Sequence, residues 1–224
     1  MSAADAVFWL ILAGIAAYVV LAGADFGAGV WNLTAERGEH GERVRHALRA
    51  SVGPLWEANH VWLVFVLVMA WTAFPGAFAD AMRALFVPLS VALLGIVLRG
   101  GAFALAHHAD GRAARRLDAV VGASSVLTPF AFGTAVGALA SGRVPADGPG
   151  DAWSGWTAPF PVAVGVLAVA LCAYLAAVYM DADARRRDGA DVIEAFHRRA
   201  LGAGAATGVL AAAALVVARA DAPA

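Results

Sequence analysis

Three ionisable side chains attract attention because they lie inside or at the ends of strongly apolar stretches: Asp25, Glu57 and Arg99. A charge at membrane depth costs about 2.5–3.5 kcal/mol at the centre of a spanning helix and less near its ends. Such groups usually face a cavity or a partner. A carboxyl group in a poorly hydrated place resists ionisation, so it can exchange protons near neutral pH. The residues therefore indicate proton transfer; the alternative is that all three side chains merely extend to the membrane surface.

The first carboxylate, Asp25, lies in the glycine-rich stretch LAGADFGAGVW, residues 21–31. Gly23 and Gly27 are four residues apart and share one helix face, and Gly29 follows. Small residues at this spacing let a second helix approach closely. We therefore expect the three glycines to pack against another helix and Asp25 to lie in the crevice between them. The alternative is a plain packing motif with an incidental Asp at the end of the helix.

The second carboxylate belongs to GPLWEANHVWLV, residues 53–64, the front of an apolar run. Glu57 and His60 are three residues apart and share a helix face. Asn59 and Trp56 share the adjacent face. This context favours a proton-carrying role for Glu57, whereas His60 alone is equally typical of a hydrogen-bonded packing residue.

Metal sites are a weaker interpretation of the same stretch. Glu57 and His60 have the Glu-x-x-His spacing of di-iron helix bundles, and Glu194 and His197 repeat it. Such a site also needs two further Glu on facing helices, and the other apolar spans carry none. Cys172 is the single cysteine, which excludes an internal disulfide and a Cys-x-x-Cys zinc or haem motif. We expect no metal site in this chain.

Haem ligands are expected to be absent from this chain as well. His107 and His108 end an apolar segment, but a paired axial site needs imidazoles that face each other at matched depth. The following residues, ADGRAARR, are typical of a solvated helix end. We therefore assign no haem to the chain.

The elements that must position these residues are membrane helices. The chain of 224 residues is 61% hydrophobic and 15% charged, whereas a soluble domain is nearer half apolar and a quarter charged. A bilayer crossing needs about 20 apolar residues. The sequence predicts an all-α, polytopic membrane helix bundle, a single transmembrane domain over 1–224. Its expected helices are 6–25, 55–74, 81–106, 118–140, 158–180 and 200–218.

The distribution of arginine predicts the orientation of this bundle. All sixteen basic residues are Arg, and thirteen of them fall in the 33–52, 99–117 and 181–199 regions. Basic loops stay in the cytoplasm, so these three regions are predicted to be cytoplasmic and both termini to lie on the outer, periplasmic or extracellular, side. The first helix then ends near Asp25, the second begins near Glu57 and the third ends at Arg99. All three ionisable groups share one depth, near the cytoplasmic face.

The motifs resemble subunit II of the cytochrome bd-type quinol oxidases, and the resemblance covers essentially the whole chain. The family has approximately Asp-Gly-Phe-Asp-Leu-Gly-Val-Gly, followed by Gly-Pro-x-Trp-Asp-Gly-Asn-Glu/Gln-Val-Trp-Leu. The matching segments are AGADFGAG (22–29), GPLWEANHVWLV (53–64), AFPGAFA (73–79), LRGGAF (98–103), APFPVAVGV (158–166) and AYLAAVYM (173–180).

The chain departs from the family pattern at several positions. Ala22 stands at the family's first Asp, and Ala104 stands at an acidic residue that follows the Arg-Gly-x-x-Phe stretch. Glu57 replaces Asp, Ala58 replaces Gly and His60 replaces Glu or Gln. The family has eight helices in two four-helix repeats, whereas six are expected here.

The resemblance implies a heterodimeric terminal oxidase of the bacterial cytoplasmic membrane that oxidises quinol and reduces dioxygen to water. Subunit I carries haems b and d and the quinol site. Subunit II binds no catalytic haem; it supports subunit I and lines a proton path from the cytoplasm. A quinone is a further expected partner. On this view Asp25 and Glu57 carry protons and Asn59 and His60 are hydrogen-bonding neighbours of Glu57. The structural residues are Gly23, Gly27, Gly29, Trp56, Trp62 and Arg99.

A proton-coupled membrane transporter that uses Asp25 and Glu57 is the alternative from another class. Its mark would be an inverted repeat with two broken helices. The sequence shows no such pair, although Pro88 and Pro129 are expected to interrupt the third and fourth helices.

Overall fold

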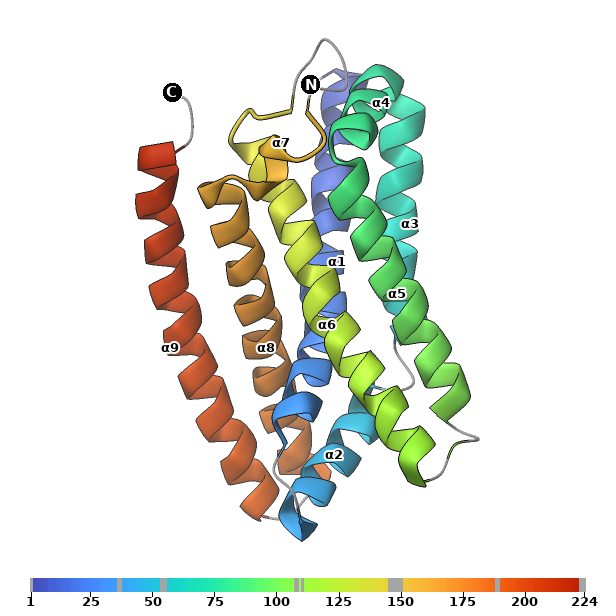
Figure 1. The fold of residues 1–224 in the computed structure, drawn as a ribbon, viewed down its shortest axis with the longest axis vertical. Helices are drawn as coiled ribbons and strands as arrows, with labels where there is room; N and C mark the ends of the chain where they lie inside the picture. The colour runs from blue at the N-terminus through green and yellow to red at the C-terminus, as the bar shows by residue number, and fades with distance from the viewer. Residues whose placement is uncertain are drawn as a thin grey trace.

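The computed structural model describes residues 2–35, 38–52, 56–106, 109, 111–144, 151–187 and 190–221. Within these ranges the regular structure is entirely helical, and the long helices run side by side (Figure 1). Five of these helices are long and apolar enough to cross a membrane, and α3 is a shorter apolar helix. The expected polytopic helix bundle is therefore confirmed. In chain order the helices are α1 (Ala3–Thr34), α2 (Glu39–Val52), α3 (Trp56–Ala73), α4 (Pro75–Ala84), α5 (Phe86–Ala106), α6 (Gly111–Ala140), α7 (Ser154–Thr157), α8 (Pro159–Arg187) and α9 (Ala190–Asp221).

The first helix, α1, is longer than its apolar segment predicts. It begins at a capping box in which Asp5 N donates to Ser2 Oγ at 3.1 Å and Ser2 N donates to Asp5 Oδ2 at 2.8 Å. It continues to Thr34, so the expectation that it ends near Asp25 was wrong. Glycine in a helix interior costs up to about 1 kcal/mol relative to alanine, but tight packing against neighbouring helices offsets that cost here. Asp25 consequently lies inside α1, two turns before its end.

The segment expected as one helix over 81–106 is two helices. The chain turns at Leu85 between α4 and α5, and Pro88 lies in the first turn of α5. Proline has no N–H and its ring clashes with the carbonyl four residues earlier, so Pro88 disfavours a helix that continues from Ala84, whereas the first turn of a helix tolerates it. Pro129, by contrast, lies inside a continuous α6, so the expected interruption of the fourth helix was wrong.

The regions expected to be arginine-rich loops are largely helical. The apolar residues of α2 fall at i, i+3 and i+4, which forms one apolar face. Val44 and Leu48 on this face belong to one buried cluster with Met180 and Phe196 from α8 and α9. Arg43 also pairs with Asp191, with Nη2 and Oδ2 2.8 Å apart. The helix α2 therefore packs across the ends of α8 and α9.

The arrangement places these arginine-rich segments together. Figure 1 shows α2, the last turns of α5 and α8 and the first turns of α6 and α9 at one end of the bundle. The beginning of α1 and the end of α9 lie at the other end, beside α4 and α7. Which end faces the cytoplasm remains a prediction from the arginine count.

Candidate functional site

Asp25 and Arg99 form a buried ion pair between α1 and α5. Arg99 Nη2 lies 2.5 Å from Asp25 Oδ1 and donates to the backbone oxygen of the same residue at 2.9 Å. The two residues are 2% and 1% exposed. Removing a charge from water costs several kcal/mol, so each of these buried charges is stable only because the other is present.

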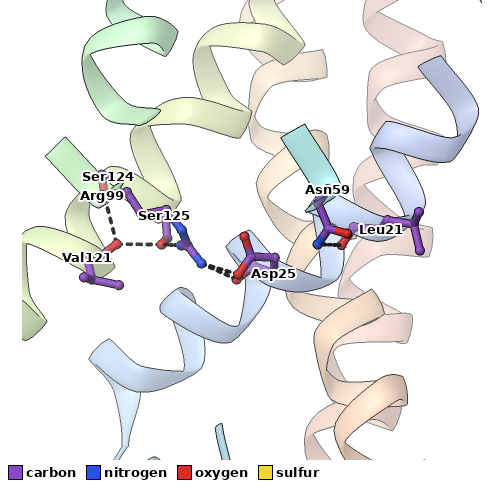
Figure 2. A network of polar contacts seen from close by, with 7 residues as sticks. All are labelled: Leu21, Asp25, Asn59, Arg99, Val121, Ser124 and Ser125. Carbon is purple, nitrogen blue, oxygen red and sulfur yellow. Dashed lines mark hydrogen bonds and ion pairs between the residues drawn. The ribbon is translucent and has the colours of Figure 1, made fainter. Parts of the chain in front are cut away.

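Further contacts fix the Arg99 guanidinium in place (Figure 2). Its Nη1 donates to Ser125 Oγ of α6, and Ser125 Oγ donates in turn to the Val121 carbonyl oxygen at 2.5 Å. The guanidinium carbon also lies 5.1 Å from the Phe26 ring centroid and 5.0 Å from that of Phe103, within the range of cation–π contacts. The pair thus joins three helices, α1, α5 and α6.

Glycines in α1 allow the neighbouring helices to come this close. A Cβ on Gly29 would overlap Ser125 Oγ, and a Cβ on Gly27 would overlap the backbone carbonyl of Cys172 in α8. A Cβ on Gly23 would also face α8, 3.1 Å from a Leu175 methyl group. The glycine face therefore brings α6 and α8 against the turns of α1 that carry Asp25.

The ion pair leaves part of the Asp25 carboxylate unused. Asp25 Oδ2 is buried and has no hydrogen-bond partner among the described residues, and the same holds for Arg99 Nε. A carboxylate has about four acceptor positions. Asp25 can therefore accept a further hydrogen bond, or a proton, without leaving Arg99.

Residues of α3 lie beside Asp25 on the other side of α1. Asn59 Nδ2 donates to the Leu21 carbonyl oxygen at 3.3 Å, one turn before Asp25 (Figure 2). The His60 ring meets the rings of Tyr18 and Phe26 edge to face, at centroid distances of 6.0 and 6.1 Å. The structure thus brings Asn59 and His60 to α1, close to Asp25.

Other residues singled out in the sequence are not part of this cluster. Glu57 is exposed in the first turn of α3, and Trp62 is 40% exposed and packs against Phe65. The side chain of Trp56 is outside the described part of the structure. The same is true of Gly53, Pro54, His107 and His108.

A pocket of about 440 Å³, lined by apolar side chains and several polar ones, opens beside Asp25. Helices α1, α2, α3 and α8 form its walls. Its polar lining groups include Asp25 and Asn59 at one part and Ser51, Asp183 and Arg186 at another. A space of this size has room for on the order of ten water molecules, and its polar groups can hydrogen-bond to some of them. Asp25 is therefore buried in protein and yet lines a space that water can fill.

Sequence reasoning placed Asp25 and Arg99 at one depth but did not pair them. The equal depth was itself a usable signal, because opposite charges buried at one level are most stable when they meet. Ser125, Phe26 and Phe103 gave no such signal, since a serine and two phenylalanines in apolar helices are ordinary. Their role depends on how α5 and α6 face α1.

Comparison with known proteins gives this site a context. The family model described as cytochrome bd terminal oxidase subunit II matches residues 3–220. "Cytochrome bd ubiquinol oxidase subunit 2" of Bacillus subtilis (strain 168) is 33% identical over 128 residues, which are 56% of this chain and 37% of that protein. "Putative cytochrome bd menaquinol oxidase subunit II" of the same strain is 32% identical over 112 residues, 50% of this chain and 32% of the relative.

These alignments span only about a third of each curated relative, whereas the family match runs along nearly the whole of this chain. The helical bundle and the positions of the AGADFGAG and GPLWEANHVWLV motifs agree with that match. The chain belongs to the cytochrome bd terminal oxidase subunit II family.

Proposed function

We propose that this chain is the haem-free subunit of a quinol-oxidising terminal oxidase and conducts protons from the cytoplasm toward a haem-bearing subunit I. In this assignment subunit I oxidises quinol and reduces dioxygen to water in the bacterial cytoplasmic membrane. The family membership supports the assembly. The observation that carries the proton path is the setting of Asp25. This buried carboxylate has one oxygen on Arg99 and the other without a partner among the described residues, and it lines a pocket with room for several water molecules.

The remaining predicted residues take different positions along this path. Asn59 lines the pocket together with Asp25, and His60 packs on the adjacent side of α1. Glu57 is exposed at the start of α3. An exposed carboxylate at the end of a membrane helix needs water or a protein partner. We infer that Glu57 faces subunit I and passes protons across the interface.

An apolar cavity of about 340 Å³ is a candidate binding place for the expected quinone. It lies between α1, α3, α6 and α8. The partly buried Tyr18 lines it and has a buried hydroxyl group without a hydrogen-bond partner in the described ranges. An apolar chain with a carbonyl group suits such a lining. We propose this cavity as the place where a quinone or lipid chain binds. The transporter alternative is not favoured, because the family match explains the same carboxylates.

The proposal is tested in the assembled complex with Asp25→Asn and Glu57→Gln. Both variants should slow quinol-driven oxygen consumption at normal haem content, and Asp25→Asn should have the larger effect because bulk water cannot bypass a buried group. Asp80→Asn is the matched control, since Asp80 pairs with Arg83 at the opposite end of the bundle. Full haem content with an unchanged rate in both variants across pH 6–8 would contradict the proton path.

A further inference from the structure

The pocket beside Asp25 has a second carboxylate at some distance from the first. Asp183 of α8 lines the same space, with Ser51 of α2 and Arg186 next to it. Ser51 Oγ donates a hydrogen bond to Asp183 Oδ2. The pocket therefore has one carboxylate held by an arginine and another held by a serine hydroxyl.

The packing of α1 on α8 shows how the two carboxylates are separated. A Cβ on Gly27 would lie 2.7 Å from Ala176 Cβ, so Asp25 is close to the level of Ala176. Asp183 is seven residues farther along α8, which corresponds to about 10 Å at 1.5 Å per residue. This direction leads toward α2 and the arginine-rich end of the bundle (Figure 1).

The face of α8 that lines the pocket is continuous over this distance. Ala176, Met180 and Asp183 all line it, and their spacing of i, i+4 and i+7 places them on one side of the helix. Asp25 and Ala176 belong to the inner part of the space, and Ser51 and Arg186 to the outer part. Arg186 is exposed, so the outer part meets the surface.

We propose that Asp183, assisted by Ser51, is the outer proton-collecting group of the path whose inner carboxylate is Asp25. This inference rests on the proposed function and adds the point where protons enter. Arg186 also lines the pocket, and the Ser51 hydroxyl holds the Asp183 carboxylate in place.

The transfer balances without any redox step. Asp183 accepts a proton from a hydronium ion at the surface, which leaves a water molecule. The proton then moves along water molecules in the pocket, each O–H bond that breaks being replaced by one that forms, until Asp25 accepts it. Asp183 returns to its anionic form, and the electrons for oxygen reduction come from quinol in the partner subunit.

The test uses the assembled complex in native membranes with saturating quinol. Asp183→Asn should lower kcat for oxygen consumption several-fold while the KM for quinol stays constant, and Asp183→Glu should restore most of the rate. Sodium formate, which is small enough to enter the pocket and carries a carboxyl group, should partly rescue Asp183→Asn. Asp181→Asn is the matched control, because Asp181 pairs with Arg185 and His197 instead.

A second measurement does not depend on how the Asp183 variant folds. Ser51→Cys is assembled first and then modified with a methanethiosulfonate reagent, so that the outer part of the pocket is blocked after folding. Complete modification should slow turnover several-fold, while the reagent should leave the unsubstituted complex unaffected.

The inference is overturned by full turnover in haem-replete Asp183→Asn, or, where that variant fails to assemble, by full turnover in completely modified Ser51→Cys. These results are separable from failure of the proposed function. If Asp25→Asn slows the enzyme but neither change at the mouth does, Asp25 receives protons by another route and only the present inference fails. If Asp25→Asn and Glu57→Gln both respire normally, the proton path itself is refuted.

Discussion

Replacing Asp25 with Asn tests whether charge, rather than hydrogen bonding alone, holds α1 and α5 together. Removing one member of a buried ion pair typically costs about 3–5 kcal/mol, because the other charge is left unpaired. The Asn oxygen can still accept from Arg99 Nη2, and the contacts of Arg99 with Ser125 and Phe103 remain. We therefore expect a loss near the lower end, about 3 kcal/mol in the free energy of unfolding.

A double-mutant cycle with Arg99→Gln isolates the charge term. Arg99→Gln alone leaves the Asp25 carboxylate buried without its cation, whereas the double variant leaves no buried charge. The cost of the double variant should therefore be smaller than the sum of the single costs by about 0.5–3 kcal/mol, the range found for residues in contact.

The measurement is an SDS titration of the purified protein in detergent, followed by the loss of helical circular dichroism. The exposed pair of Asp80 and Arg83 is the control, with side chains 29% and 61% exposed. Surface pairs contribute about 0–1 kcal/mol, so Asp80→Asn should change little. If the Asp25 and Arg99 costs add to within about 0.5 kcal/mol, the two residues are not energetically coupled and the argument from burial is wrong.

The remaining predictions concern orientation, packing and cofactors. A cysteine at Asp151 should react with an impermeant thiol reagent in intact cells and one at Arg112 only after permeabilisation; the reverse pattern would invert the topology. Gly27→Leu should lower the free energy of unfolding by more than the about 1–3 kcal/mol typical of overpacking, because a Cβ at position 27 would overlap the α8 backbone at Cys172. Gly76 faces open space, so Gly76→Leu should cause no such loss. The chain purified without partners should show no Soret band in its absorption spectrum, and a stoichiometric band would refute the haem assignment.

The apolar segments were sufficient to predict the bundle, because hydropathy over about 20 residues reports directly on which stretches can lie in lipid. They could not locate the helix ends. Hydropathy falls after Asp25 and before residue 200, but the helices continue there, where Ala28 of α1 and Phe196 of α9 are buried in one cluster with the apolar face of α2. The break at Leu85 lies three residues before Pro88, which was expected to interrupt this helix, but the apolar residues around it made 81–106 look like one span.

The candidate site was predictable in part. Asp25 was identifiable because a carboxylate in a glycine-rich apolar helix has few ordinary explanations. Its partner depended on which face α5 turns to α1, and a single sequence does not determine that rotation. Asp183 was not singled out, because it lies among the charges of a segment that resembles a solvated loop. Only the structure shows that α8 places it in the lining of a pocket.

The enclosed guanidinium of Arg99 has a consequence for the proposed proton path. While Asp25 is ionised, the pair is neutral as a whole; once Asp25 takes up a proton, the same buried volume holds one net positive charge. Coulomb energies are large where the effective dielectric constant is low, so that charge repels a second proton and favours departure of the first. Ser125, Phe26 and Phe103 hold the guanidinium in place, so this repulsion would act whenever Asp25 is protonated. Within the proposed proton path, Arg99 would therefore favour release of the proton from Asp25.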